Sequence, residues 1–163
     1  METPDVRSEP LGKRHARLMG RLCRETDRKM LISLGNWTDP ERFVRAQANR
    51  SLEAWAFYKN EILVGVAGIL LVPGKYQLPW YLGTYAAEDA ALLPAAQRYV
   101  DNLRNKYDLL LGMVPCADPK LLEICTRLGF SVMAPKQFGA KGDLWCKVVL
   151  DTRRIVEASD ARY

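Results

Sequence analysis

Residues Trp55 to Val72 read WAFYKNEILVGVAGILLV, and this stretch carries the strongest strand signal of the chain. It consists of two runs of strand-forming residues separated by the polar trio Lys59-Asn60-Glu61. Two such runs around a short polar break are typical of a β-hairpin, so the trio is predicted to form its turn. The longest apolar run, Ile62 to Val72, is well short of the roughly 20 residues that a membrane-spanning helix needs.

The residues before the hairpin are expected to be helical. Between Leu11 and Leu34, apolar side chains recur at helical spacing on one face, while the arginines lie largely elsewhere. Gly35-Asn36 is a typical helix end. Thr38-Asp39-Pro40-Glu41 supplies an N-cap and an early proline for a second helix, roughly Pro40 to Asn49. Residues 1–10 are polar and contain two prolines, so they are predicted to be a flexible lead-in.

Strands and helices alternate after the hairpin. A short strand is expected from Leu78 to Thr84, with Pro79 near its start. The helical pattern from Ala87 to Tyr107 contains Pro94, which is tolerated in a first turn, so this helix is predicted to begin near Leu93. The remaining predicted elements are a strand Asp108–Val114, a helix Pro119–Leu128 closed by Gly129, a strand Phe130–Met133, a loop Pro135–Gly142 and a last strand Leu144–Leu150.

The order of these elements indicates the fold class. Strands that alternate with helices after residue 78 predict a parallel pair joined by a crossover, whereas the hairpin and the final strands predict antiparallel edges. We therefore expect an α/β fold with a mixed sheet and helices on both faces. The 163 residues are enough for one domain, placed at residues 11–150, followed by a charged tail at residues 151–163.

Charge and cysteine content restrict the classes of partner and cofactor. The net charge is +5, and the first fifty residues hold eleven Lys and Arg against seven Asp and Glu. Such a surface either attracts acidic partners or is simply a solvated helix face. Nucleic acid is not expected as a partner, because basic and aromatic residues do not interleave. The polar first residues carry no apolar signal segment, so a cytoplasmic location without membrane association is expected.

The four cysteines are Cys23, Cys116, Cys125 and Cys146, and none forms a Cys-x-x-Cys pair. With His15 as the only histidine, no metal site is predicted. A Ser/His/Asp triad is not supported either, because no Gly-x-Ser-x-Gly elbow is present. The cysteines are predicted to be free, buried thiols.

Three segments in register carry a resemblance to a known family. Residues 121–130, LLEICTRLGF, resemble a closing helix that ends in a Leu-Gly-Phe turn, and the hairpin described above resembles a second family element. PWYLGT at residues 79–84, a long helix and Lys106-Tyr107-Asp108 form the third, and Arg24-Glu25-Thr26-Asp27-Arg28 is similar as well. Over residues 11–150 the chain resembles the GNAT superfamily of N-acetyltransferases, and within it the small GNAT-like proteins of tailed phages (podoviruses).

The resemblance implies a sheet splayed between two parallel strands and acetyl-CoA as the cofactor. The implied activity is transfer of acetyl to a primary amine of a protein or a small molecule. The alternative is a catalytically degenerate phage protein that acts by binding, in virion morphogenesis or in takeover of a host protein. A protein partner and a homodimer built through the exposed last strand and the apolar hairpin are further expectations.

The resemblance also places the cofactor-binding residues. The pyrophosphate loop falls on Leu82, Gly83, Thr84, Tyr85, Ala86 and Ala87, where backbone N–H groups at a helix start would hold phosphate. The family pattern Gln/Arg-x-x-Gly-x-Gly/Ala is absent, since no Gly follows Gly83, and Glu88 and Asp89 would repel a phosphate. The alternative is that Thr84 caps the end of a strand. Asp118 falls where the family often has Asn, and it is equally explained as an N-cap before Pro119.

The candidate catalytic residues are Cys125 and Tyr81. Cys125 occupies the position of the family's usual Tyr acid, and a thiol with an ordinary pKa of about 8.5 can donate a proton. Its alternative role is that of a small buried residue. Tyr81 flanks the implied cleft. Other groups were weighed as a general base without a choice among them: Glu53, Glu61, Tyr85 and His15.

Overall fold

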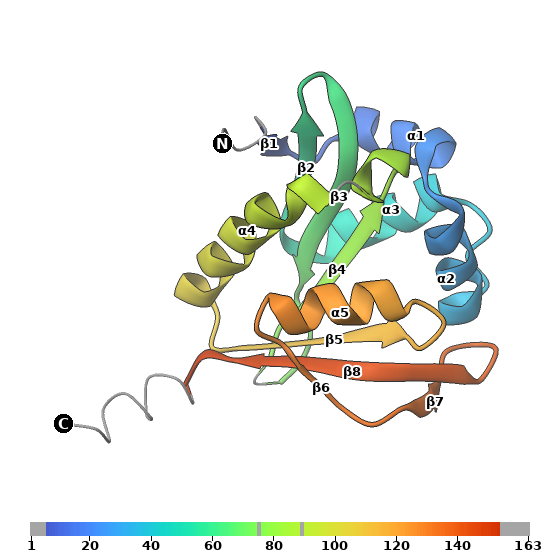
Figure 1. Cartoon of the computed structure of the whole chain (residues 1–163). Coiled ribbons are helices and arrows are strands. Elements are labelled where there is room, and N and C mark those ends of the chain that lie inside the picture. The colour runs from blue at the N-terminus through green and yellow to red at the C-terminus, as the bar shows by residue number, and fades with distance from the viewer. Residues whose placement is uncertain (1–5, 75, 89, 154–163) are drawn as a thin grey trace.

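The computed structural model describes residues 6–74, 76–88 and 90–153 (Figure 1). No described helix is long and apolar enough to cross a membrane. The elements run in this order: β1 Val6–Pro10, α1 Lys13–Leu22, α2 Glu25–Gly35, α3 Pro40–Arg50, β2 Ser51–Lys59, β3 Ile62–Leu70, β4 Leu78–Gly83, the 3-10 helices η1 Tyr85–Glu88 and η2 Ala90–Leu92, α4 Leu93–Lys106, β5 Leu109–Pro115, α5 Pro119–Arg127, β6 Ser131–Val132, β7 Lys136–Phe138 and β8 Asp143–Asp151.

The hairpin predicted from the sequence is confirmed as β2 and β3. The strands pair antiparallel from Lys59↔Ile62 to Ser51↔Leu70. Asn60 takes a left-handed conformation with φ 55°, which a short turn needs and Asn tolerates better than most residues. The hairpin is the centre of a four-stranded antiparallel sheet in the order β1-β2-β3-β4.

The second half of the chain forms a smaller sheet. β8 lies between β5 and β6 and also pairs with β7, with all of these pairings antiparallel. The predicted loop Pro135–Gly142 therefore contains a short strand. The tip that joins β7 to β8 docks on α2, where the Ala140 N–H donates to Leu34 O at 3.1 Å. The buried Trp145 indole donates to Ser33 Oγ at 3.2 Å, across 112 residues of sequence.

Helices cover both faces of the sheet, as predicted. Val66 and Ile69 of β3 point to opposite faces because side chains alternate along a strand. Val66 packs in one apolar cluster with α1, α2 and α3, through residues such as Met19, Leu31 and Val44. Ile69 packs in a second cluster with α4, α5, β5 and β8. Figure 1 shows α4 and α5 together over the side of the molecule that faces the viewer.

Two predictions about the first 35 residues need correction. The single helix over residues 11–34 is wrong, because the chain leaves helical conformation at Cys23 and Arg24. There Cys23 forms an antiparallel bridge with Thr84, and the Arg24 N–H donates to Gly83 O at 3.0 Å. Residues 6–10 of the predicted lead-in form β1, which pairs with β2 from Val6↔Lys59 to Pro10↔Trp55. Residues 1–5, and residues 154–163 of the tail, lie outside the described residues.

Candidate functional site

The two sheets meet at the start of β4 and β5 and then part. The Gln77 N–H donates to Leu109 O at 2.9 Å and the Leu111 N–H donates to Gln77 O at 3.0 Å, which is one step of a parallel ladder. The next residue on this edge of β4 is Pro79, which has no N–H to continue the ladder. In the described part of the chain no further pairing joins β4 to β5. The splay expected between two parallel strands is therefore present, and Pro79 ends the pairing.

The parting leaves one edge of β4 without a strand partner. N–H and C=O groups of alternate residues face the same side of a strand, so Tyr81 and Gly83 present theirs to the gap, as Gln77 does. The groups of Gly83 are engaged: its N–H donates to Asp27 at 2.6 Å, and its C=O accepts the Arg24 N–H. In the described residues neither backbone group of Tyr81 is paired with β5 or with the junction of α1 and α2.

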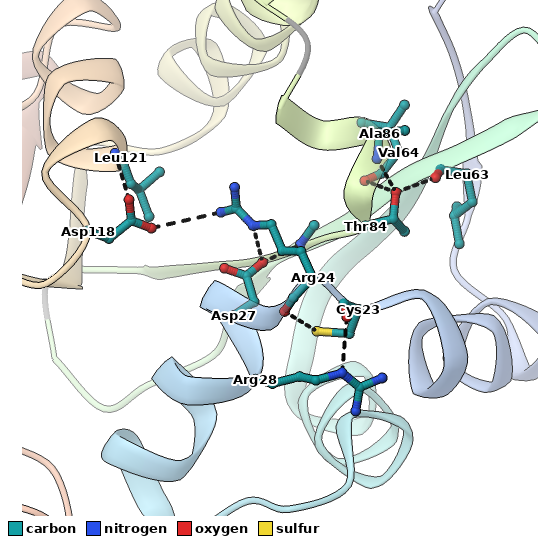
Figure 2. A network of polar contacts seen from close by, with 11 residues as sticks. Cys23, Arg24, Asp27, Arg28, Leu63, Val64, Thr84, Ala86, Asp118 and Leu121 are labelled. Carbon is teal, nitrogen blue, oxygen red and sulfur yellow. Dashed lines mark hydrogen bonds and ion pairs between the residues drawn. The ribbon is translucent and has the colours of Figure 1, made fainter.

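Three charged side chains lie beside this gap, as Figure 2 shows. Arg24 Nε is 2.9 Å from Asp27 Oδ2, and Arg24 Nη2 is 4.0 Å from Asp118 Oδ2. All three side chains are at least largely buried, with exposed fractions of 13%, 2% and 10%. Burial raises the pKa of Asp27 above its ordinary value, although the Arg24 ion pair and the Gly83 N–H oppose the rise. The gap is therefore bordered by one cation and two carboxyl groups.

The sequence alone did not single out Arg24 and Asp27 as site residues. Both belong to the Arg24–Arg28 segment, which drew attention only through its resemblance to phage proteins. Their side chains converge because the chain breaks between α1 and α2, and that break was hidden by the continuous helical pattern. A signal was nevertheless present, since Asp27 falls on the otherwise apolar buried side of α2 together with Leu31.

The loop after β4 is organised by Thr84. Its hydroxyl lies 2.7 Å from Leu63 O, to which it donates, and it accepts the Ala86 N–H at 3.2 Å (Figure 2). The Ala87 N–H donates to Thr84 O at 3.0 Å. Two of the amides predicted to hold pyrophosphate are thus bonded within the loop, as the capping alternative for Thr84 has it. Leu82 is fully buried against the first cluster. The assignment of residues 82–87 to cofactor binding stays a prediction.

The two candidate catalytic side chains border the site from different elements. A Cβ placed on Gly83 would lie 2.9 Å from the Tyr81 hydroxyl oxygen, and one on Gly65 would lie 3.2 Å from it. The hydroxyl thus packs over two glycines, and burial raises its pKa. Cys125 lies on α5, where burial and the nearby Asp118 charge raise the pKa of its thiol to about 11. At neutral pH both groups keep their protons and are able to act as acids rather than as bases.

Asp118 has the capping role that the sequence offered as one of two explanations. Its carboxylate accepts the Leu121 N–H at 3.1 Å at the start of α5. The same carboxylate faces Arg24 across the gap. Capping therefore does not remove it from the site.

The weighed candidates for a general base are engaged elsewhere or exposed. The Glu53 carboxylate accepts hydrogen bonds from Tyr107, Trp55 and Lys106. His15 is buried between Glu9 and the Gly12 N–H. Glu61 is 92% exposed, and Tyr85 is 67% exposed. Among the described residues no cluster of three or more His, Cys, Asp or Glu has the arrangement of a metal site.

Comparisons with known proteins bear on the fold. No protein-family model matches the chain, and no curated protein matches it. Among solved structures, a putative acetyltransferase of Salmonella typhimurium with its cofactor acetyl-CoA is 14% identical, with a TM-score of 0.68 over 90% of this chain and 94% of that one. Spermidine N-acetyltransferase of Vibrio cholerae, in complex with CoA and spermine, is 8% identical, with a TM-score of 0.69 over 93% and 98%.

An N-acetyltransferase of Staphylococcus aureus Mu50 is 15% identical, with a TM-score of 0.68 over 91% of this chain and 99% of that chain. These proteins cover nearly the whole described domain, including both sheets and the helices that flank them. At such low identity the likeness bears on architecture and not on chemistry. Together with the splay between β4 and β5, it shows that this chain has the fold of the GNAT N-acetyltransferases.

Proposed function

We propose that this protein is an N-acetyltransferase that uses acetyl-CoA and acetylates a primary amine of a protein or a small molecule. The observation that carries the proposal is the unpaired edge of β4 at Tyr81, where the strand has parted from β5. An extended ligand with amide groups pairs favourably with such an edge, as peptides do when they extend a sheet. Acetyl-CoA supplies an activated acetyl thioester on an amide-containing arm of this kind.

The residues beside the gap suit this chemistry. The Tyr81 N–H and C=O would hold the amide-containing arm, and the protonated Cys125 thiol would give its proton to the departing sulfur. The Tyr81 hydroxyl is the second candidate for that proton. Asp27 and Asp118 offer negative charge to an incoming ammonium group, although Arg24 balances part of it. The solved structures with acetyl-CoA, or with CoA and spermine, support the same class of reaction.

One part of the site does not fit a pyrophosphate as it stands. The N–H groups of Ala86 and Ala87 donate to Thr84, so phosphate oxygens would have to compete with those bonds. Glu88 adds a negative charge at the end of η1. We therefore expect acetyl-CoA to bind with a dissociation constant in the micromolar range rather than more tightly.

Calorimetric titration with acetyl-CoA tests the proposal directly. Binding should also raise the midpoint of thermal unfolding, since a ligand of the folded state stabilises it. Release of free CoA thiol should then be followed with spermidine, a lysine peptide and a free N-terminal peptide as acceptors. The absence of both heat and thermal shift at millimolar acetyl-CoA would overturn the proposal.

A pair of variants on α5 tests the assignment of the acid. Cys125→Ala should lower kcat at least tenfold, with little change in the affinity for acetyl-CoA, because general acids contribute roughly 10²–10⁴-fold. Thr126→Ala is the matched control, since Thr126 is an exposed neighbour whose hydroxyl only donates to Leu122 O. Equal kcat values for the two variants would transfer the role to Tyr81, to be tested as Tyr81→Phe.

The engagement of Ala86 and Ala87 favours a second candidate function, in which the fold binds a protein partner without catalysis. This is the role that the resemblance to phage proteins suggests. It predicts no acetyl-CoA binding and retention of a partner in stoichiometric amount by the tagged chain. Retention should be lost when the surface that binds the partner is changed and kept in Cys125→Ala.

A further inference from the structure

Two of the four thiols are in contact. Cys116 Sγ and Cys146 Sγ lie 3.3 Å apart, across the antiparallel pair of β5 and β8. Cys146 is opposite Val114, and the Cys116 N–H donates to Leu144 O at 3.0 Å. Side chains two positions apart on one strand share a face, so Cys116 and Cys146 are diagonal neighbours on the same face. Backbone pairing thus holds the two sulfurs together.

The two thiols differ in their access to solvent. Cys146 is buried, with 4% of its surface exposed, whereas Cys116 is partly exposed in the turn that follows β5. A soluble oxidant therefore meets Cys116 first and finds a second thiol already in contact with it. Redox-active cysteines are typically accessible and lie next to a resolving cysteine, which is the arrangement seen here.

We propose that Cys116 and Cys146 form a site of reversible oxidation that closes as an intramolecular disulfide. With hydrogen peroxide as the oxidant, the Cys116 thiolate attacks one peroxide oxygen, the O–O bond breaks, and Cys116 becomes a sulfenic acid as hydroxide leaves. The Cys146 sulfur then attacks the Cys116 sulfur. The S–S bond forms as the S–O bond breaks, and the oxygen leaves as water with the proton from Cys146. Two thiols and one peroxide give one disulfide and two waters.

The structure allows the bond to form with a small movement. A disulfide brings the sulfurs to about 2 Å, so they must approach by a little more than 1 Å. Cys116 is the first residue of a turn, where the chain adjusts more easily than inside a strand. The turn leads directly to Asp118, the N-cap of α5, whose N–H donates to Pro115 O at 3.0 Å. The bond would therefore fasten the start of α5 to β8.

The other two cysteines provide internal controls. Cys23 is fully buried in the first apolar cluster, and its thiol faces Arg24 O at 3.7 Å. Cys125 lies on α5 beside Asp118. Neither is in contact with another sulfur in the described structure. Oxidation of the folded protein should therefore be selective for the one pair.

Peptide mapping of the folded full-length chain after hydrogen peroxide treatment tests the proposal. The expected product is a peptide pair linked through Cys116 and Cys146, with a mass loss of about 2 Da that dithiothreitol reverses. Cys116→Ser and Cys146→Ser should abolish the link, whereas Cys125→Ser should keep it. The oxidised wild type should also unfold at a higher temperature than the reduced form, because a cross-link constrains the unfolded chain. That shift should be absent in Cys116→Ser.

The proposal is overturned if Cys116 proceeds to the sulfinic acid without a link, or if the only linked species are dimers on a non-reducing gel. It is also overturned if the link forms only in denaturant, or if no thiol reacts. A serine variant that fails to fold is replaced by Cys116→Ala, with cooperative thermal unfolding as the criterion for a folded chain. The outcome is independent of acetyl-CoA binding, so it stands apart from the proposed activity.

Discussion

The carboxylate of Asp27 accepts the backbone N–H of Gly83 at 2.6 Å, which joins α2 to the last residue of β4. The same oxygen lies 2.9 Å from Arg24 Nε. One buried carboxylate therefore satisfies a strand edge and balances a largely buried guanidinium. Burial of the charge opposes this arrangement and raises the pKa of Asp27, so its stability depends on both partners remaining in place.

Replacement of Asp27 should separate these two contributions. Asp27→Ala leaves the Gly83 N–H unpaired and Arg24 uncompensated, so we expect a loss of about 3–5 kcal/mol in the free energy of unfolding. Asp27→Asn keeps an acceptor for Gly83 and should lose less. Urea unfolding measures both. Glu25→Ala, an exposed change in the same helical turn, should cost less than about 1 kcal/mol. A similar loss for Ala at positions 25 and 27 would show that the network does not stabilise the fold.

Pro79 ends the pairing of β4 with β5, so its replacement should narrow the gap. Pro79→Ala introduces an N–H that faces Leu111 O and can add one ladder bond. Slower amide exchange at this position and at least tenfold weaker acetyl-CoA binding are expected, measured by hydrogen exchange and calorimetry. Pro73→Ala, in the exposed loop before β4, is the control and should leave binding unchanged. Unaltered affinity in Pro79→Ala would mean that the width of the gap at this point does not matter for the cofactor.

Glu53 should make stability depend on pH. Burial alone would raise its pKa, but hydrogen bonds from Tyr107, Trp55 and Lys106 outweigh burial and lower it from 4.5. The folded carboxyl therefore binds a proton less readily than the unfolded one. Its contribution is full above about pH 4.5 and disappears as the pH falls through the lowered folded pKa.

The variant Glu53→Gln should thus be less stable than the wild type at pH 7, and the difference should shrink as the pH falls below about 4.5. Urea unfolding at a series of pH values measures this. The matched control is Glu123→Gln, whose exposed carboxylate pairs only with Arg127 on α5, and it should change little at any pH. A stability difference for Glu53→Gln that is constant from pH 3 to pH 7 would contradict the assigned role of the charge.

His15 should act as a structural residue rather than a titrating surface group. Its Nδ1 accepts the Gly12 N–H at 2.9 Å, so Nε2 carries the proton that it donates to Glu9 at 2.7 Å. His15→Phe keeps a ring but removes both bonds, with an expected loss of about 2 kcal/mol in the free energy of unfolding. The exposed Lys13→Ala on the same helix serves as the control. If the two variants are equally stable, the bonds at His15 contribute nothing.

The hairpin and the alternation after residue 78 were predictable because they depend on local sequence. Two strand-forming runs around Lys59-Asn60-Glu61 form a turn whatever lies around them, and Pro94 marks the first turn of α4 from its own chemistry. The break at Cys23 and Arg24 was not predictable, because the helical pattern continues through it. The chain leaves the helix there to pair with Gly83 and Thr84, which lie 60 residues away in sequence.

The candidate site was predicted in part for the same reason. Tyr81, Cys125 and Asp118 were found because the resemblance places them, whereas Arg24 and Asp27 enter the site only through tertiary pairing. β1 was missed because it is an edge strand whose side chains are mostly exposed, so it has no apolar alternation. The bonding of Ala86 and Ala87 within their own loop depends on the orientation of the Thr84 hydroxyl, and no spacing in the sequence encodes that orientation.

The contact between Trp145 and Ser33 has a consequence for how the chain is made. Its two residues are 112 positions apart, so the end of α2 lacks this partner until residue 145 has left the ribosome. β5 likewise waits for β8, its only strand partner along Leu109–Pro115 in the described structure. The second sheet therefore cannot assemble during most of synthesis, and its apolar strand Leu109–Pro115 remains uncovered for that time. A nascent chain stalled before β8 would be the form that chaperones recognise best.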